Sequence, residues 1–314
     1  MPRPRRSARA LTLALATALA ACAPAAGAQA REPGFDAERA FAYLERQVAY
    51  GPRVPGSVGH RRQLEWMREL LRARADTLIE QRFTHRTARG EWLQLTNLWA
   101  QFRPELEERL LLVAHWDTRP TADRAEDPAA RALPVPGAND GASGTAVLLE
   151  LAALLGTRPP PIGVDLLLTD GEDYGPGEGD MFLGAKHFAA HLPAGYAPRA
   201  AVVLDMVADR SPRFVVEGYS AHLAPAVVRR VWDAAAALGY GDVFVREAGD
   251  EIADDHLPLN AAGIPAALVI DFEYGPGNRY WHTPDDVPQH TSARTLGIVG
   301  AVMVALIYGA ERAP

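Results

Sequence analysis

Acidic and imidazole side chains recur in this sequence at the points where short apolar runs end. They are His115 and Asp117 in LLLVAHWDT, Asp140 in PGANDGASG, Glu172 and Asp173 in LLLTDGEDYG, Asp205 in AVVLDM, and His282 in YWHTPDD. Open α/β sheets build their sites at the carboxyl ends of their strands, so we expect these side chains to converge. Imidazole nitrogens and carboxylate oxygens are zinc ligands, and a glutamate beside such ligands is the usual general base. The pattern predicts a metal-dependent active site.

Each of these residues also has an ordinary structural role open to it. A lone histidine at a strand end is more often structural than a ligand. Asp140 precedes a helix and could cap it, although Ser143 is the more natural cap. One of Asp254 and Asp255 is expected to cap the helix that follows them. Asp205 ends an apolar run, and a buried carboxylate there needs a cation, a proton or hydrogen bonds.

Other catalytic motifs are missing from the sequence. Ser143 stands in GASG rather than in a G-x-S-x-G elbow, and H-E-x-x-H, Walker and Rossmann patterns are absent. Cys22 is the single cysteine, so the mature domain has no thiol nucleophile, thiolate metal site or internal disulfide. The scattered acids and histidines therefore remain the best candidates for chemistry.

The apolar pattern describes the elements that must position these residues. FDAERAFAYLERQVAY, with Asp36 as a cap, and HRRQLEWMRELLRARA have helical spacing, and two alternating segments, TLIEQRFTHRT and WLQLTNLWAQF, follow them as strands. From RLLLVAHWD onward, buried strands, among them RFVVEG, alternate with helices. This predicts a three-layer α/β/α sandwich with a mixed, mainly parallel central sheet covered on both faces. The last helix, with LGIVGAVMVALIYGA, is too short to span a bilayer and should cover the core.

The N-terminus reads as an export signal. Residues 1–21 have basic residues followed by a short apolar stretch, as in a secretory signal peptide. The run Leu19-Ala20-Ala21-Cys22 is similar to a bacterial lipobox, whereas Ala28-Gln29-Ala30 would allow ordinary cleavage near residue 30. We therefore predict a periplasmic protein, with a lipid anchor at Cys22 under the first alternative. A single zinc-dependent catalytic domain is predicted over residues 35–312.

The charge of the chain limits its partners. The formal net charge is -7, and removing the four arginines of the signal lowers it to -11. Such an acidic surface argues against nucleic acid as a partner. It is compatible with a peptide substrate, and we expect a monomer.

The joint order of the motifs resembles the M28 clan of co-catalytic zinc aminopeptidases. The shared features are HxD, NDGASG with LLELA, DGED, a strand-end aspartate and WHT. Within the clan, the chain is most similar to glutaminyl cyclases, through GPRVPGSVGH, GDMFLGAKHFA, DDHLPLNAAGIPA and YWHTPDD. The resemblance extends over most of the chain after the signal.

This resemblance implies a role for each site residue. It implies that one catalytic zinc is bound by three ligands, Asp140, Asp173 and His282. Glu172 would be the general acid and base, Asp205 and Asp254 would form an acidic network near it, and Trp281 would pack against the substrate side chain. In the two-metal aminopeptidases, the positions of His115 and Asp205 hold a second metal. One zinc is therefore expected, and two are allowed.

Two departures from the family pattern concern the site. The second acid after DG is Asp173, where glutamate is commoner, and its shorter arm must bring it closer to the metal. The following loop, YGPGEG, lacks the tryptophan of the animal cyclases, so Tyr174, Phe182 or Tyr280 would replace part of the substrate cradle.

The sequence therefore predicts a zinc-dependent glutaminyl-peptide cyclotransferase. Its substrates would be peptide or protein N-termini, whose N-terminal glutamine becomes pyroglutamate with release of ammonia. The alternative is an M28-type co-catalytic zinc aminopeptidase. A third hypothesis, an inactive binding domain, is disfavoured because every expected ligand is retained.

Overall fold

The computed structural model describes residues 1–2 and 34–309 of the chain. The predicted signal peptide, Cys22 and the cleavage site near residue 30 lie outside the described residues. The described residues from Gly34 onward belong to one compact unit. The exact bounds predicted for the catalytic domain, 35–312, stay a prediction.

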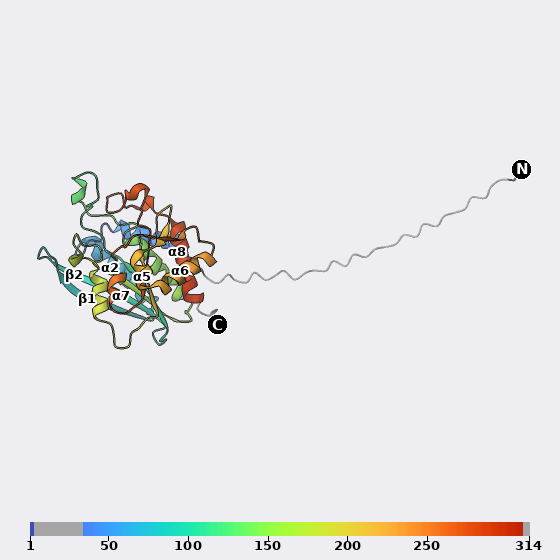
Figure 1. The fold of residues 1–314 in the computed structure, drawn as a ribbon, viewed down its shortest axis with the longest axis horizontal. Helices are drawn as coiled ribbons and strands as arrows, with labels where there is room; N and C mark the ends of the chain where they lie inside the picture. The colour runs from blue at the N-terminus through green and yellow to red at the C-terminus, as the bar shows by residue number, and fades with distance from the viewer. Residues whose placement is uncertain (3–33, 310–314) are drawn as a thin grey trace. The chain divides into compact units, whose positions relative to one another are not determined.

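A six-stranded mixed sheet forms the centre of this unit, in the order β1-β2-β4-β3-β5-β8. The strands are β1 (Thr77–Arg86), β2 (Trp92–Phe102), β3 (Arg109–His115), β4 (Gly163–Thr169), β5 (Ala200–Asp205) and β8 (Ala266–Ile270). Strand β2 pairs antiparallel with β1 and β4, and the remaining pairs are parallel. Figure 1 shows β1 and β2 lying together at one edge. The predicted sheet class is confirmed.

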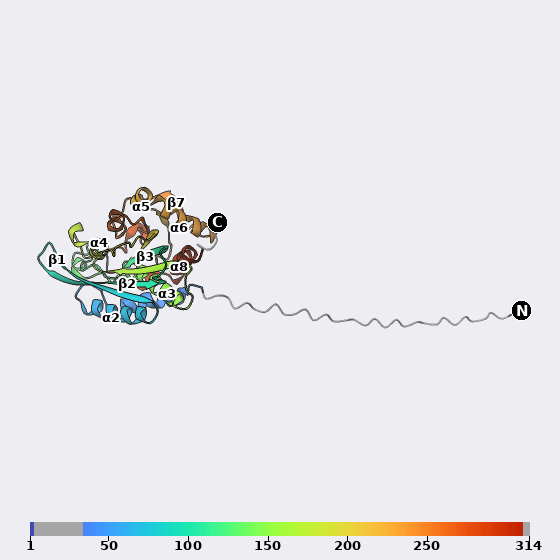
Figure 2. The same cartoon turned by 90° about the horizontal axis from the view of Figure 1, so that it is seen from below.

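Helices cover both faces of the sheet. They are α1 (Ala37–Ala49), α2 (Val58–Arg72), α3 (Ala142–Leu155), α4 (Leu183–Ala190), α5 (Gly218–Leu223), α6 (Pro225–Ala237), α7 (His256–Ala261) and α8 (Ala293–Tyr308). Figure 2 shows α2 and α3 on one side of the sheet and α4 on the other. Short 3-10 turns occur at Ala130–Ala132, Glu178–Asp180, Pro276–Asn278 and Pro288–His290. The predicted three-layer arrangement is therefore confirmed.

Strand β3 shows why its apolar run is uninterrupted. All seven of its residues are buried. Leu110 and Leu112 pack into the core beneath α3 and α8, whereas Leu111 and Val113 pack into the core beneath α4 and α7. Successive side chains of a strand point to opposite faces, so both faces need apolar residues. The strand is therefore held rigidly, with His115 at its end.

The last helix packs against the domain, as its sequence predicts. α8 contacts α1, α3 and α6, and most of its apolar side chains are buried. Within residues 34–309, no helix combines the length and the apolar character that crossing a membrane requires. At the other end of the domain, the predicted cap of α1 is confirmed, because the Asp36 carboxylate accepts a hydrogen bond from Arg39 N at 3.0 Å.

One predicted strand lies outside the main sheet. The segment RFVVEG contains β6 (Phe214–Val216), which pairs in parallel with β7 (Phe244–Ala248) in a separate two-stranded sheet. Neither β7 nor the short α5 was among the elements predicted from the sequence. Most of β7 is exposed and Ser220 is the buried residue of α5, so hydrophobic periodicity carries a weak signal for both.

Two predicted helix caps are wrong. The N-cap of α3 is Gly141, and Ser143 lies inside the first turn. The Ser143 hydroxyl donates to the carbonyl of Asn139 and accepts from Val207 N at 2.9 Å. Ser143 therefore bonds to the loop that follows β5 and does not cap α3, because α3 packs directly against that strand.

Neither Asp254 nor Asp255 caps α7 through its side chain. Asp255 occupies the N-cap position without a side-chain hydrogen bond to the helix. Its carboxylate instead accepts from the Thr169 hydroxyl at 2.5 Å, at the end of β4. This tertiary contact gives one oxygen of the buried carboxylate a hydrogen-bond donor from the end of β4.

Candidate metal centre and active site

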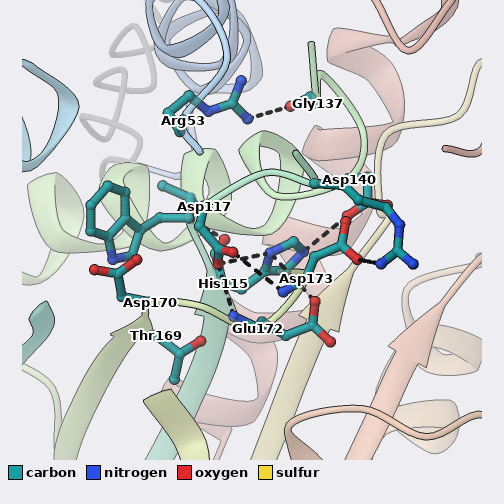
Figure 3. A network of polar contacts seen from close by, with 12 residues as sticks. Arg53, His115, Asp117, Gly137, Asp140, Thr169, Asp170, Glu172 and Asp173 are labelled. Carbon is teal, nitrogen blue, oxygen red and sulfur yellow. Dashed lines mark hydrogen bonds and ion pairs between the residues drawn. The ribbon is translucent and has the colours of Figure 1, made fainter. Parts of the chain in front are cut away.

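The ends of three neighbouring parallel strands deliver the predicted site residues. His115 is the last residue of β3, Asp205 is the last residue of β5, and Glu172 and Asp173 follow β4 in a short turn. Asp140 precedes α3, which packs against β3 and β5. Figure 3 shows His115, Asp140, Glu172 and Asp173 close together although they come from separate segments. The predicted convergence is confirmed.

Two groups of side chains could each hold a metal ion, and they share Asp140. One group is His115, Asp140 and Asp205, the other is Asp140, Asp173 and His282, and the ligand atoms of each lie within 4.8 Å of one another. His115 Nε2 lies 3.2 Å from Asp140 Oδ1, and His282 Nε2 lies 3.5 Å from Asp140 Oδ2. Asp140 therefore presents one carboxylate oxygen to each histidine.

The residues in both groups suit zinc. Each group combines one imidazole with two carboxylates, and all of these side chains are buried. Among the described residues, Asp173 Oδ2 is a buried oxygen without a hydrogen-bond partner. A buried carboxylate oxygen without a partner is costly, and a bound cation would remove that cost. Nitrogen and oxygen ligands in this number match a zinc centre in both groups, and the unpartnered Asp173 oxygen supports the group with His282.

Buried acceptors fix the loops that carry the ligands. Asp117 accepts from Glu172 N at 3.0 Å and from Asp173 N at 3.3 Å, so it shapes the turn after β4. Its Oδ1 also lies 3.6 Å from His115 Nδ1. Asp117 is therefore placed to orient the His115 ring and the turn that carries Glu172 and Asp173.

The carboxylate of Asp286 likewise fixes the backbone of the turn that carries Asp140. Its carboxylate accepts from Asn139 N at 2.7 Å and from Asp140 N at 3.1 Å, which holds the turn before α3. Asp286 was not among the predicted site residues. Its signal was its position four residues after His282 in the same motif, but its partner lies 146 residues away.

Glu172 lies in a buried acidic environment beside the metal ligands. Burial raises its pKa well above the usual value, His115 opposes this, and Asp254 and Asp173 add to it. Burial and the carboxylates of Asp205 and Asp255 likewise raise the pKa of Asp254. Asp254 therefore acts directly on Glu172, whereas Asp205 acts on Asp254, and the role predicted for these acids stays a prediction.

Trp281 forms one wall of a hollow beside the cluster. Its ring stacks on the His282 ring with centroids 4.0 Å apart, and the Arg124 guanidinium lies 4.9 Å from its ring centroid. The hollow has a volume of about 650 Å³ and is bounded by residues of 124–130 and 277–285. None of the three aromatic residues considered as replacements for the missing tryptophan lines it: Tyr174, Phe182 and Tyr280.

Two further residues near the ligands escaped the sequence analysis. Arg119 and Asp123 lie in the long loop after β3 and contact Asp173 and His282. Their only sequence signal was their nearness to HWD, because the loop itself has no recognisable pattern.

Residues 97–307 match the model of peptidase family M28. The chain belongs to peptidase family M28. Among curated proteins, it is 30% identical to Aminopeptidase YwaD of Bacillus subtilis (strain 168) over 191 residues, which cover 56% of this chain and 38% of that relative. The match thus spans under half of that relative's length. Family membership together with the ligand groups indicates zinc, in a number that the geometry leaves at one or two.

Solved structures of enzymes that are named for two different activities are similar to this M28 chain. A Bacteroides thetaiotaomicron glutaminyl cyclase bound to N-acetylhistamine has 37% identity and a TM-score of 0.84, covering 88% of this chain and 99% of its own. A leucine aminopeptidase precursor from Bacteroides thetaiotaomicron has 36% identity and a TM-score of 0.85, covering 88% and 98%. The family and fold are therefore shared by both kinds of enzyme.

Proposed function

We propose that this M28 protein is a zinc-dependent glutaminyl-peptide cyclotransferase. The observation that carries the proposal is the position of Glu172, a buried carboxyl group with a raised pKa, beside the group Asp140, Asp173 and His282. Cyclisation needs one residue that first takes up and then delivers a proton, next to a centre that activates an amide. The similarity to solved glutaminyl cyclases over nearly their whole length supports the same proposal.

In the proposed reaction, Glu172 carries one proton from the attacking amine to the leaving ammonia. When bound by Asp140, Asp173 and His282, zinc supplies a Lewis acid that polarises the side-chain amide carbonyl of an N-terminal glutamine. The α-amine nitrogen forms a bond to that carbonyl carbon, and Glu172 accepts the proton that the nitrogen loses. The bond from the carbon to the amide nitrogen then breaks, and Glu172 returns the proton to the departing ammonia. Burial and Asp254 keep the pKa of Glu172 raised for both steps, and Asp205 in turn raises the pKa of Asp254.

The substrate is proposed to enter beside Trp281. The indole would pack against the glutamine side chain, and the hollow of about 650 Å³ next to it offers room for the residues that follow. We also propose that the enzyme acts in the periplasm as a monomer, on the N-termini of exported peptides and proteins. A lipid anchor at Cys22 would hold it at the membrane.

Incubation with a glutamine-initiated peptide tests the activity. The zinc-loaded protein should release ammonia and produce an N-terminal pyroglutamate, measured by a coupled ammonia assay and by mass spectrometry. The same peptide with an acetylated α-amine is the control, because it lacks the nucleophile. Absence of ammonia release by a protein that demonstrably contains zinc would sink the proposal.

A second candidate, a co-catalytic zinc aminopeptidase, is favoured by one observation. The group His115, Asp140 and Asp205 also has the residues and spacing for a metal, which gives room for two ions sharing Asp140. This candidate predicts about two zinc ions per chain by elemental analysis, together with cleavage of amino-acid anilides. The cyclase predicts about one zinc and no anilide cleavage.

A further inference from the structure

Arg119 joins a metal ligand to the long loop after β3. Only 6% of its side chain is exposed, and its Nη1 donates to Asp173 Oδ1 at 2.5 Å. Its Nε and Nη2 donate to the two oxygens of Asp123 at 3.1 and 3.0 Å. A planar guanidinium held by two carboxylates has little freedom, so Arg119 fixes the orientation of Asp173.

Asp123 extends the same set of contacts to a second ligand. His282 Nδ1 lies 3.1 Å from Asp123 Oδ1. Donation from Nδ1 to this carboxylate selects the tautomer whose Nε2 lone pair is free. That Nε2 lies 3.5 Å from both Asp140 Oδ2 and Asp173 Oδ1, so it faces the other ligands.

Arg119 and Asp123 together form a clamp on the ligands Asp173 and His282, and backbone packing holds this clamp in place. Gly175 has φ +53, and a Cβ there would lie 2.8 Å from Arg119 Nη1. Arg124 N also donates to His282 O at 3.3 Å. The loop is therefore fastened to both segments that carry the ligands, the turn after β4 and the segment around His282.

The clamp contacts only one of the two candidate metal groups. Within the described part of the chain, no arginine hydrogen-bonds to His115 or Asp205, which bond to each other at 3.0 Å. Asp173 Oδ1 is occupied by Arg119, whereas its Oδ2 has no hydrogen-bond partner among the described residues. Arg119 thus holds the Asp173 oxygen that faces His282 Nε2, and the second oxygen stays without a hydrogen-bond partner among the described residues.

We propose that Arg119 and Asp123 are positioning residues that set the metal affinity of the Asp140, Asp173 and His282 group. The inference rests on the proposed zinc site, and neither residue touches the reacting atoms. Arg119 compensates for the aspartate at position 173 by fixing its carboxylate, and Asp123 fixes the ring and tautomer of His282. The other group, with His115 and Asp205, does not depend on them.

Zinc affinity, measured by chelator competition without substrate, tests the clamp. Asp123→Ala should weaken zinc binding by about 10–100-fold, as removal of such outer partners typically does. Asp123→Asn keeps an oxygen that accepts from His282 Nδ1 and should recover much of the affinity. Arg119→Lys keeps the positive charge but loses the fork that joins Asp173 to Asp123, so it should also weaken binding.

Arg109→Gln is the matched control. Arg109 forms a similarly buried two-point ion pair with Asp165 at the other end of β3, so its loss should lower stability and leave zinc affinity unchanged. The proposal is overturned if Asp123→Ala and Arg119→Lys bind zinc as tightly as the wild type. It is also overturned if Arg109→Gln weakens zinc binding equally, or if the wild type binds no zinc. A wild type that binds zinc but releases no ammonia would overturn the cyclase alone.

Discussion

At the scale of single residues, the candidate metal ligands are distinct from Glu172, the residue proposed to transfer protons. Asp140, Asp173 and His282 place their donor atoms together, whereas Glu172 belongs to neither candidate metal group. Glu172 instead lies 3.8 Å from His115 Nδ1 and near the buried carboxylates. Substitution of Glu172 should therefore affect proton transfer and leave the metal in place.

Under the proposed cyclase mechanism, Glu172→Gln should lower kcat by about 10²–10⁴-fold, because the carboxamide cannot accept a proton from the attacking amine. Zinc content by elemental analysis should match that of the wild type. Glu178→Gln is the control, since Glu178 is an exposed acid of the same loop. Retained turnover in Glu172→Gln would remove Glu172 from the mechanism, and loss of zinc would make it a ligand.

At the scale of elements, the close approach of α3 to the sheet positions Asp140. A Cβ on Gly144 would lie 2.1 Å from Leu204 O and 2.9 Å from Ala114 Cβ. Only glycine allows the helix to lie this near to β5 and β3. Since Asp140 immediately precedes the helix, a displaced α3 would also move the ligand that both metal groups share.

Gly144→Ala should lower the free energy of unfolding by about 1–3 kcal/mol, because the added methyl group overpacks the contact with β5. Zinc affinity should fall with it. Gly179→Ala is the control, because a Cβ there meets nothing within 4 Å and the backbone is not strained. Urea unfolding and chelator competition measure the two effects. Equal behaviour of the two variants would show that the Gly144 contact can relax.

At the scale of the whole molecule, buried acids outnumber buried bases at the site. Burial raises the pKa of Asp173, Asp255 and Asp286 to about 7. Protons or a metal must therefore compensate carboxylates that the fold forces together. The same effect occurs at Asp271, which lies beyond the end of β8 and outside both metal groups.

Asp271 offers a test of how pH affects stability. Burial raises its pKa to about 7, and Asp209 adds to the effect. Because the pKa of Asp271 in the folded protein exceeds the unfolded value of about 3.9, folding favours its protonated form. The stability that this proton contributes is complete below about pH 4 and is lost as the pH rises through about 7. Asp271→Asn stays neutral, and its carboxamide oxygen can still accept from Arg213 N, as Asp271 Oδ2 does at 2.8 Å.

The variant should thus be more stable than the wild type at about pH 8, by up to about 4 kcal/mol, and equal to it at about pH 4. Urea unfolding at both pH values, with the metal removed, measures the difference. A constant difference at all pH values would mean that Asp271 does not titrate in this range.

The residues themselves carried much of the information about this protein. Uninterrupted apolar runs such as that of β3 predicted a sheet covered on both faces, since burial of both faces leaves no polar positions. The acids and histidines at the ends of these runs predicted a metal site, because parallel strands end at a common edge. These features are local, so a single sequence displays them directly.

Contacts between distant segments were decided only by the tertiary structure. Asp123 and His282 are 159 residues apart, and nothing near either residue announces the other. Ser143 and Asp255 likewise bond to other elements instead of capping their own helices. The order of the strands and the path of the long loop bring such partners together. A buried polar group then bonds to whichever partner the fold places within reach. Leaving the group without a hydrogen bond costs more free energy than giving up a local interaction such as a helix cap.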